Sequence, residues 1–226
     1  MIDRLKNTSH FYIPYLVLFG LSMIFFFYQS HGAFVLWLNS LHNPVWDFFF
    51  KYWTHTGDGI FFSVIAIALL ILKRKFGIVL SLIGISVGLT SLFFKQVLFP
   101  TAPRPSIFFR DQEILRFVEG VDLLSQYSFP SGHAMTAFAL ATFVALILQN
   151  NNYSMLLLIA GCLAAISRVY LAQHFLIDIM AGSLMGVIIA TSFYMAFEKY
   201  LNDENHDQAK TPDQDLEDMN LDEEIE

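Results

Sequence analysis

Long apolar segments alternate with less apolar connections of very different lengths along most of this 226-residue chain. Six of them stand out, at residues 11–28, 59–72, 77–99, 132–149, 153–171 and 175–197. About 20 apolar residues are enough for a helix to cross a bilayer. The pattern therefore predicts an all-α fold, a polytopic membrane bundle of six transmembrane helices, in which the segment 59–72 is the shortest.

The connections between these segments differ in length and composition. Residues 29–58 are rich in Trp and Phe, which is typical of a helix that lies at the headgroup level. Residues 100–130 form the longest connection, whereas the very short link 73–76 contains the basic cluster Lys73-Arg74-Lys75. Because Lys and Arg gather in short cytoplasmic loops, we expect this cluster and both termini to be cytoplasmic. The connections 29–58 and 100–130 and the turn at 167–175 then face the outside.

The composition supports a membrane protein, with 55% hydrophobic and only 15% charged residues. In soluble domains, about a quarter of all residues are charged. The net charge of −7 arises in the last part of the chain, because residues 202–226 contain 11 acidic residues and one lysine. We therefore expect a membrane-embedded domain at 1–201 and an acidic, disordered cytoplasmic tail at 202–226. No Cys/His pattern has the spacing of metal ligands.

Polar motifs stand at the ends of several apolar segments. Pro130-Ser131-Gly132-His133 opens the fourth segment, Ser167-Arg168 closes the fifth, and His174 with Asp178 opens the sixth. Lys95 lies near the end of the third segment, ahead of Arg104. The six-span topology brings all of them to the outer membrane face. Because ionisable groups beside a membrane span are costly and usually functional, we interpret this set as one site.

Cations outnumber acids in this set, which favours the binding of an anion. The planar guanidinium groups of Arg104 and Arg168 match a phosphate well, and Lys95 adds a third positive charge. Ser131 and Gly132 begin a helix, whose free N–H groups and dipole also attract an anion.

The histidines of the set add reactivity. His174 and Asp178 are four residues apart on one helix face, so the carboxylate can fix the imidazole tautomer. The other ring nitrogen is then available as a nucleophile. His133 can protonate the leaving oxygen and later activate water. Phosphoryl transfer, which needs mainly positioning and charge stabilisation, is the chemistry that this arrangement predicts.

Together the motifs resemble the signature of the type-2 phosphatidic acid phosphatase superfamily, the integral-membrane lipid phosphate phosphatases. Residues 130–133 match its Pro-Ser-Gly-His motif, and residues 167–178 match Ser-Arg-x5-His-x3-Asp. The family's first motif reads Lys-x6-Arg-Pro, whereas eight residues separate Lys95 from Arg104 here. We expect a turn at residues 100–103 to absorb the two extra residues. In the alternative, Lys95 only extends to the headgroup level.

The resemblance implies a phosphohistidine intermediate at His174, with His133 as the acid and Asp178 as the orienting group. The phosphate would be bound by Lys95, Arg104, Ser131, Gly132 and Arg168. The resemblance implies neither a metal nor another cofactor. The expected partners are a lipid phosphate substrate and membrane lipids but no nucleic acid, and protein partners remain open.

The sequence thus predicts metal-independent hydrolysis of a lipid phosphate or polyprenyl pyrophosphate at the outer face of a bacterial inner membrane. Phosphatidic acid, phosphatidylglycerol phosphate, undecaprenyl pyrophosphate and lipid A phosphate all remain open as substrates. A lipid phosphotransferase could use the same residues. A non-catalytic lipid or anion transporter is a weaker alternative, because the sequence shows no internal repeat and no broken helix pair. Soluble vanadate haloperoxidases share the site chemistry, but the apolar segments argue against them.

Overall fold

The computed structural model describes residues 6–112 and 114–203, and every regular element in these ranges is helical. The elements in chain order are α2 (Ser9–Tyr28), α3 (Ala33–Ser40), α4 (Pro44–Trp53), η1 (Thr54–Gly57), α5 (Gly59–Leu72), α6 (Arg74–Phe93), η2 (Phe94–Leu98), α7 (Pro105–Phe108), η3 (Arg110–Gln112), α8 (Gly132–Leu148), α9 (Asn151–Tyr170), α10 (Leu176–Ala196) and α11 (Glu198–Asn202). The predicted all-α class is confirmed for this part of the chain. Most of the predicted acidic tail lies outside it.

Each of the six apolar segments forms a helix, namely α2, α5, α6, α8, α9 and α10. By length and hydropathy, α2, α9, α10 and the combined α6–η2 helix are long enough to cross a membrane. The other two are short, since α5 has 14 residues and α8 has 17. A helix in each of the six apolar segments is therefore confirmed, whereas six complete membrane spans stay a prediction.

A bend of 50° joins the helical stretch Pro44–Gly57 to α5, so the two together can form a fifth span. Asp58 ends the first stretch in an extended conformation, and its Oδ1 accepts a hydrogen bond from Phe61 N (2.8 Å) to cap α5. Gly57 lies against the start of α8, where a Cβ would come within 2.9 Å of the carbonyl oxygen of His133. Glycine permits this close approach, because a side chain at position 57 would separate the two backbones. The bent pair also means that the expectation of no broken helix pair was wrong.

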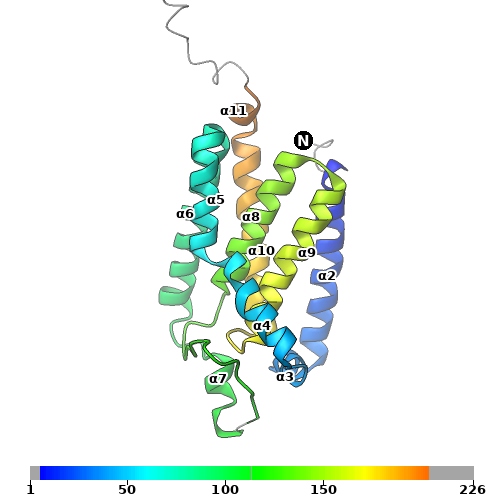
Figure 1. Ribbon diagram of the computed structural model, residues 1–226, viewed down its shortest axis with the longest axis vertical. Helices are drawn as coiled ribbons and strands as arrows, with labels where there is room; N and C mark the ends of the chain where they lie inside the picture. Colours follow the sequence, from blue (N-terminus) through cyan, green and yellow to red (C-terminus); the bar gives the residue numbers. More distant parts are fainter. Residues whose placement is uncertain (1–5, 113, 204–226) are drawn as a thin grey trace, which may run out of the picture.

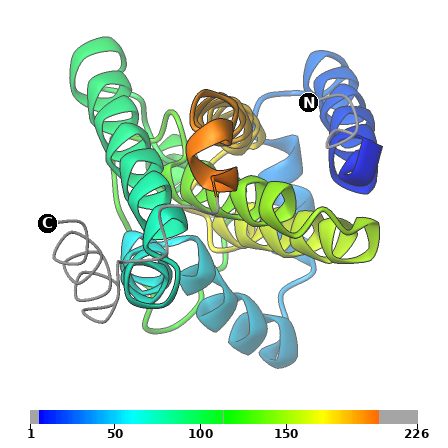
Figure 2. The ribbon, with the colours of Figure 1, turned by 90° about the horizontal axis from the view of Figure 1, so that it is seen from above.

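Helices α8 and α10 cross at the centre of the bundle, with α2 and α6 on opposite sides (Figures 1 and 2). Two glycines of α10 allow this contact. A Cβ on Gly182 would lie 2.4 Å from the carbonyl oxygen of Ser131, and one on Gly186 would lie 2.3 Å from that of Met135. Small residues at helix crossings let backbones approach closely in membrane bundles. The crossing holds the start of α8 against the start of α10, where two of the sequence motifs lie.

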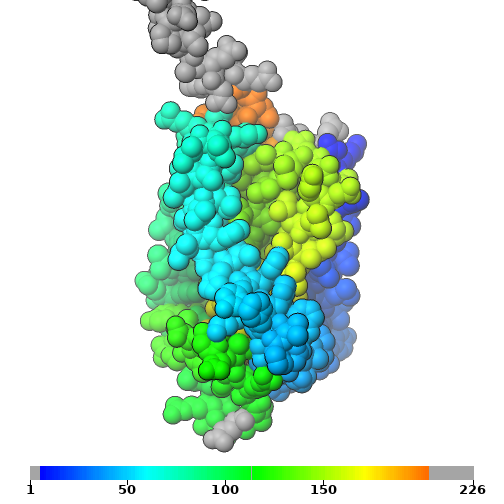
Figure 3. Space-filling view, viewed as in Figure 1, coloured from blue at the N-terminus to red at the C-terminus, as the bar shows by residue number. Residues whose placement is uncertain are grey.

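The two ends of the bundle carry different connections. Helix α11 and the α5–α6 link lie at one end, where Lys75 Nζ donates to the carbonyl oxygen of Asp203 (Figure 1). Helices α3, α4 and α7 lie at the opposite end, and in Figure 3 they cover it together with residues 100–112 and 114–127. This separation agrees with the two-sided arrangement predicted from the loops. Which end faces the cytoplasm stays a prediction.

Candidate active site

The site residues predicted from the sequence come together at the α3–α4 end of the bundle, where α8 and α10 begin and α9 ends (Figure 1). Arg104 lies 3.4 Å from the imidazole of His174, and His174 lies 3.4 Å from the carboxylate of Asp178. The backbone N–H of Ser131 donates to the carbonyl of Asp178 (3.0 Å), which ties the second motif to the third. Segments far apart in the chain therefore build one site.

His174 lies between a carboxylate and a guanidinium. Its Nδ1 faces Oδ2 of Asp178 at 3.4 Å, and its Nε2 faces Nη1 of Arg104, also at 3.4 Å. We assign the ring proton to Nδ1, because the carboxylate can only accept there. The lone pair of Nε2 is then directed to the place where Arg104 would draw an anion.

Burial lowers the pKa of His174 to about 3; the Asp178 carboxylate opposes this shift, and Arg104 and Arg168 add to it. The imidazole is 1% exposed, so water does not stabilise its charged form. His174 is consequently neutral at physiological pH, which is the protonation state that a nitrogen nucleophile requires.

Asp178 is held by three groups around one oxygen. Oδ2 accepts hydrogen bonds from the hydroxyl of Ser128 (2.5 Å) and from the backbone N–H of Phe175 (2.8 Å), and it faces His174. The bond to Phe175 is local, because an acid at the third position of a helix caps the residue that precedes the helix. The carboxylate is 3% exposed. Its orientation toward His174 is therefore fixed by its surroundings.

Arg104 is buried and uses several donors on backbone carbonyls. Its Nε donates to Gln126 O (2.8 Å), and its Nη1 donates to Gln173 O (2.9 Å). Nη2 lies 3.4 Å from Tyr127 O. These bonds hold the guanidinium in one orientation beside His174. A rigid guanidinium loses less entropy when it binds a phosphate oxygen.

Arg168 is held differently, by a single side chain. Its Nη1 donates to Thr54 Oγ1 (2.8 Å), in the turn that precedes the bend before α5. Its Nε is buried without a hydrogen-bond partner in the described part of the chain. Because buried donors are normally satisfied, this N–H is a candidate partner for an oxygen of the substrate.

Lys95 lies on η2, a π-helical turn that continues α6. The backbone hydrogen bonds in this turn run from residue i+5 to residue i, as in the bond from Phe99 N to Phe94 O (2.8 Å). A π turn takes in more residues than an α turn, and such turns often occur at functional sites. A further turn follows at Pro100 and Thr101. The extra residues of the first motif are thus accommodated partly in η2, and not only in the turn at 100–103.

The ammonium of Lys95 reaches the start of α8. A Cβ on Gly132 would lie 3.7 Å from Lys95 Nζ and 3.3 Å from Ser91 Oγ. Ser131 is fully buried, and its Oγ caps α8 by accepting from Ala134 N (3.4 Å). Lys95 and the N-terminal amides of α8 therefore present positive charge to the same place, whereas the hydroxyl of Ser131 supports the helix start.

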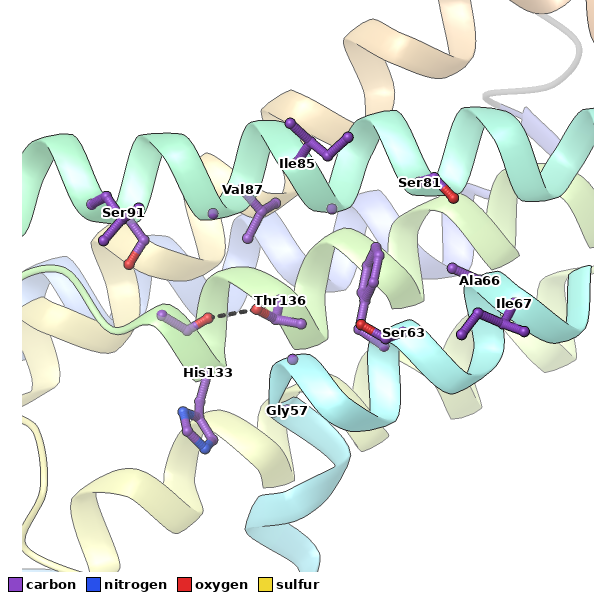
Figure 4. A pocket seen from close by; sticks show the side chains of 16 residues that line it. Gly57, Ser63, Ala66, Ile67, Ser81, Ile85, Val87, Ser91, His133 and Thr136 are labelled. Atoms are coloured by element: carbon purple, nitrogen blue, oxygen red, sulfur yellow. Dashed lines mark hydrogen bonds between the residues drawn. The ribbon is translucent and has the colours of Figure 1, made fainter. Parts of the chain in front are cut away.

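His133 lines two cavities. A groove of about 640 Å³ runs between α5 and α6 over α8, and Figure 4 shows His133 at its end. A second pocket of about 350 Å³ lies between the α4–η1 stretch and residues 120–124, and His133 and Arg168 both line it. The groove lining is largely apolar, whereas the second pocket contains charged residues. His133 can therefore reach a group that extends into either cavity.

Three residues of the site were not identified from the sequence: Thr54, Ser128 and Gln173. The Nε2 of Gln173 donates to Asp122 O (3.0 Å), so Gln173 joins Arg104 to the 120–124 segment. Thr54 lies 114 positions from Arg168, and no local pattern indicates that contact. A weak signal existed for Ser128, which stands two residues before Pro130 in a polar connection.

A family model described as the PAP2 superfamily matches residues 75–201. The chain is 26% identical over 189 residues to a lipid A 4'-phosphatase of Bacteroides thetaiotaomicron, covering 78% of this chain and 81% of that protein. It is 28% identical to a lipid A 4'-phosphatase of Porphyromonas gingivalis, covering 72% and 70%.

Two crystal structures have a similar fold. LpxE of Aquifex aeolicus superposes with a TM-score of 0.63 at 23% identity, covering 73% of this chain and 94% of that one. The PAP2-type phosphatidylglycerolphosphate phosphatase of Bacillus subtilis gives 0.59 at 22% identity, covering 86% and 97%.

Proposed function

Because the chain belongs to the PAP2 superfamily, the type-2 phosphatidic acid phosphatases that its motifs resemble, we propose that it hydrolyses a lipid phosphate or lipid diphosphate. The observation that carries this proposal is the position of His174, a neutral imidazole with Asp178 on one nitrogen and Arg104 beside the other. This arrangement supports nucleophilic catalysis on a phosphorus atom that the cations hold in place.

The reaction has two steps. In the first, Nε2 of His174 attacks the terminal phosphorus. The bond from that phosphorus to the leaving oxygen breaks, which is the ester oxygen of a lipid phosphate or the bridging oxygen of a lipid diphosphate, and protonated His133 gives its proton to that oxygen. In the second, His133 takes a proton from water, the resulting hydroxide attacks the phosphohistidine, and the bond from phosphorus to Nε2 breaks. Inorganic phosphate leaves, and both histidines return to their starting states. Arg104, Arg168 and Lys95 balance the charge on the phosphoryl oxygens.

The groove between α5 and α6 is suited to an apolar chain of the substrate (Figure 4). Phe62, Ala66 and Ile67 line it. On its α6 side, Gly88 leaves open space, whereas Gly84 lets the ring of Phe62 pack against the helix. A chain in this groove would place its polar end at His133. The leaving oxygen would then lie beside the group that protonates it.

We propose that the protein acts in a bacterial inner membrane, with both termini in the cytoplasm and the site on the outer face. The support is the basic cluster at residues 73–75, which lies at the opposite end of the bundle from the site. The lipid A 4'-phosphatases of two bacteria match most of the chain. A lipid A phosphate therefore belongs in the substrate panel beside phosphatidic acid, phosphatidylglycerol phosphate and undecaprenyl pyrophosphate.

Phosphate release from this panel, measured in detergent with a chelator present and without a lipid acceptor, tests the function. We expect the wild type to release phosphate and to form an acid-labile phosphoprotein after rapid quenching with radiolabelled substrate. His174→Ala should lose both, whereas His10→Ala, at the exposed start of α2, should keep both. More than about a tenth of the activity in His174→Ala, a loss below about 1.4 kcal/mol, would contradict the assignment. Turnover only with an added acceptor lipid would indicate a phosphotransferase.

A further inference from the structure

The second pocket, between the α4–η1 stretch and residues 120–124, is larger than one phosphate group requires. Its volume of about 350 Å³ lies in the range of small-molecule sites. Arg168 and His133 line it on the side of the catalytic centre, and Lys51, Tyr52 and His55 line it from the α4–η1 stretch. A phosphate beside Arg168 would therefore leave space next to it, toward Lys51.

The charges around this space favour an anion. The lining contains Lys51, His55, His133 and Arg168 but one acid, Asp122, whose side chain is exposed. Asp58 lies 3.1 Å from His55 Nδ1 and so is engaged with that ring. The α4–η1 stretch also contributes Lys51 and Tyr52 to the lining. Lys51 is thus the cation that faces the free space.

Lys51 has no carboxylate within salt-bridge distance among residues 6–112 and 114–203. Its Nζ donates to the backbone carbonyl of Glu119 (2.7 Å), which neutralises no charge. The same ammonium packs against Gly120, where a Cβ would lie 2.6 Å from Nζ and where φ is +72°. Glycine at this position therefore lets the connection wrap around the ammonium. Two of the three donors of Nζ remain for another partner.

We propose that Lys51 forms a second anion subsite, which binds a second phosphate adjoining the phosphate that His174 attacks. The substrate class is a lipid whose polar head carries two neighbouring phosphates, as in a lipid diphosphate. This inference rests on the proposed function, since it takes the catalytic phosphate to lie between Arg168 and His174. It assigns the polar pocket to the second phosphate and leaves the apolar groove to the lipid chain.

Competitive inhibition by two soluble anions tests the subsite. Inorganic phosphate probes the catalytic position alone, whereas methylenediphosphonate, which cannot be hydrolysed, probes both positions. With a short-chain phosphatidic acid as the assay substrate, we expect Lys51→Met to raise the inhibition constant of methylenediphosphonate at least fivefold more than that of phosphate. Lys199→Met, on α11 at the other end of the bundle, should change neither constant.

Equal increases for both anions would overturn the subsite, because they would mean that Lys51 only anchors the 118–124 connection through Glu119. Unchanged constants for both anions would overturn it as well. Thermal stabilisation of the same proteins by the two anions provides a readout that needs no turnover. If the wild type released no phosphate from any lipid but Lys51→Met still weakened the effect of methylenediphosphonate selectively, the proposed function would fail and the subsite would stand.

Discussion

The hydroxyl of Ser128 donates a hydrogen bond of 2.5 Å to Oδ2 of Asp178, across 50 positions of the chain. The same hydroxyl lies 3.5 Å from Nδ1 of His174. Ser128 therefore belongs to the group that orients the nucleophile, although it lies outside the motifs by which the site was found. Its side chain is 1% exposed, so no water can replace this donor without a rearrangement.

Ser128→Ala should lower kcat about 10- to 100-fold, because a hydrogen bond to a charged group contributes about 1.5–3 kcal/mol. KM should change little, since the phosphate-binding cations stay in place. Ser128→Thr, which keeps the hydroxyl, should recover part of the rate. Ser40→Ala removes a hydroxyl that bonds only within α3, and it serves as the control. A wild-type kcat in Ser128→Ala would show that Phe175 N and His174 orient Asp178 sufficiently.

Arg168→Lys tests the guanidinium geometry. A lysine keeps the charge but cannot bond Thr54 and present a second N–H from the same plane. We expect a loss of at least about 100-fold in kcat/KM, which is about 2.7 kcal/mol. Near wild-type rates would mean that Arg168 acts as a diffuse charge. Vanadate, which adopts the pentacoordinate geometry of the phosphoryl-transfer transition state, should inhibit the wild type and should bind this variant more weakly.

Lys95→Met distinguishes the two interpretations of the longer first motif. Since Nζ lies close to Gly132, we expect the variant to lose at least about tenfold in kcat/KM. Lys73→Met is the control, because it removes an exposed cation directly before α6, at the end of that helix remote from Lys95. If kinetics were unchanged in Lys95→Met, this lysine would only extend to the headgroup level.

Acidification should destabilise the protein through His174. Its pKa is about 3 in the folded protein and about 6.5 when unfolded, so below pH 6.5 the unfolded state binds a proton that the folded state does not. The free energy of unfolding should fall by up to about 1.4 kcal/mol per pH unit between pH 6.5 and 4.5. Thermal unfolding in detergent should show this decline in the wild type and a shallower one in His174→Asn. Parallel curves would contradict the assignment to His174.

Cysteine labelling tests the orientation of the bundle. In a Cys162→Ala background, we introduce single cysteines at Ser106, in α7 near the site, or at Gln208, in the acidic tail. A membrane-impermeant thiol reagent on intact cells should label position 106 but not 208, because the 73–75 cluster favours a cytoplasmic location. Permeabilised cells, in which both should react, provide the control. The reverse pattern would move the site to the cytoplasmic leaflet.

The amino-acid sequence was sufficient to predict the six apolar helices and to single out the motif residues that the fold brings together, but not Thr54, Ser128 or Gln173. Hydropathy is a local property, so each of the six apolar segments was recognisable without its neighbours, and each forms a helix. The i, i+4 spacing of His174 and Asp178 is likewise local, and their side chains do face each other. Even the shortness of α5 was visible between Asp58 and Lys73.

Only the tertiary structure decided how these parts meet. The partner of Arg168 is Thr54, the partner of Asp178 is Ser128, and Lys95 reaches Gly132 through a π turn. The two cavities at His133 depend on where α4, α5 and α6 pack. Each of these contacts joins residues that lie far apart in the chain. Hydropathy identifies apolar segments, but it does not predict which polar side chains will come into contact. Their meeting depends on close backbone crossings, such as that of α8 with α10 at Gly182, which bring distant segments within hydrogen-bond distance.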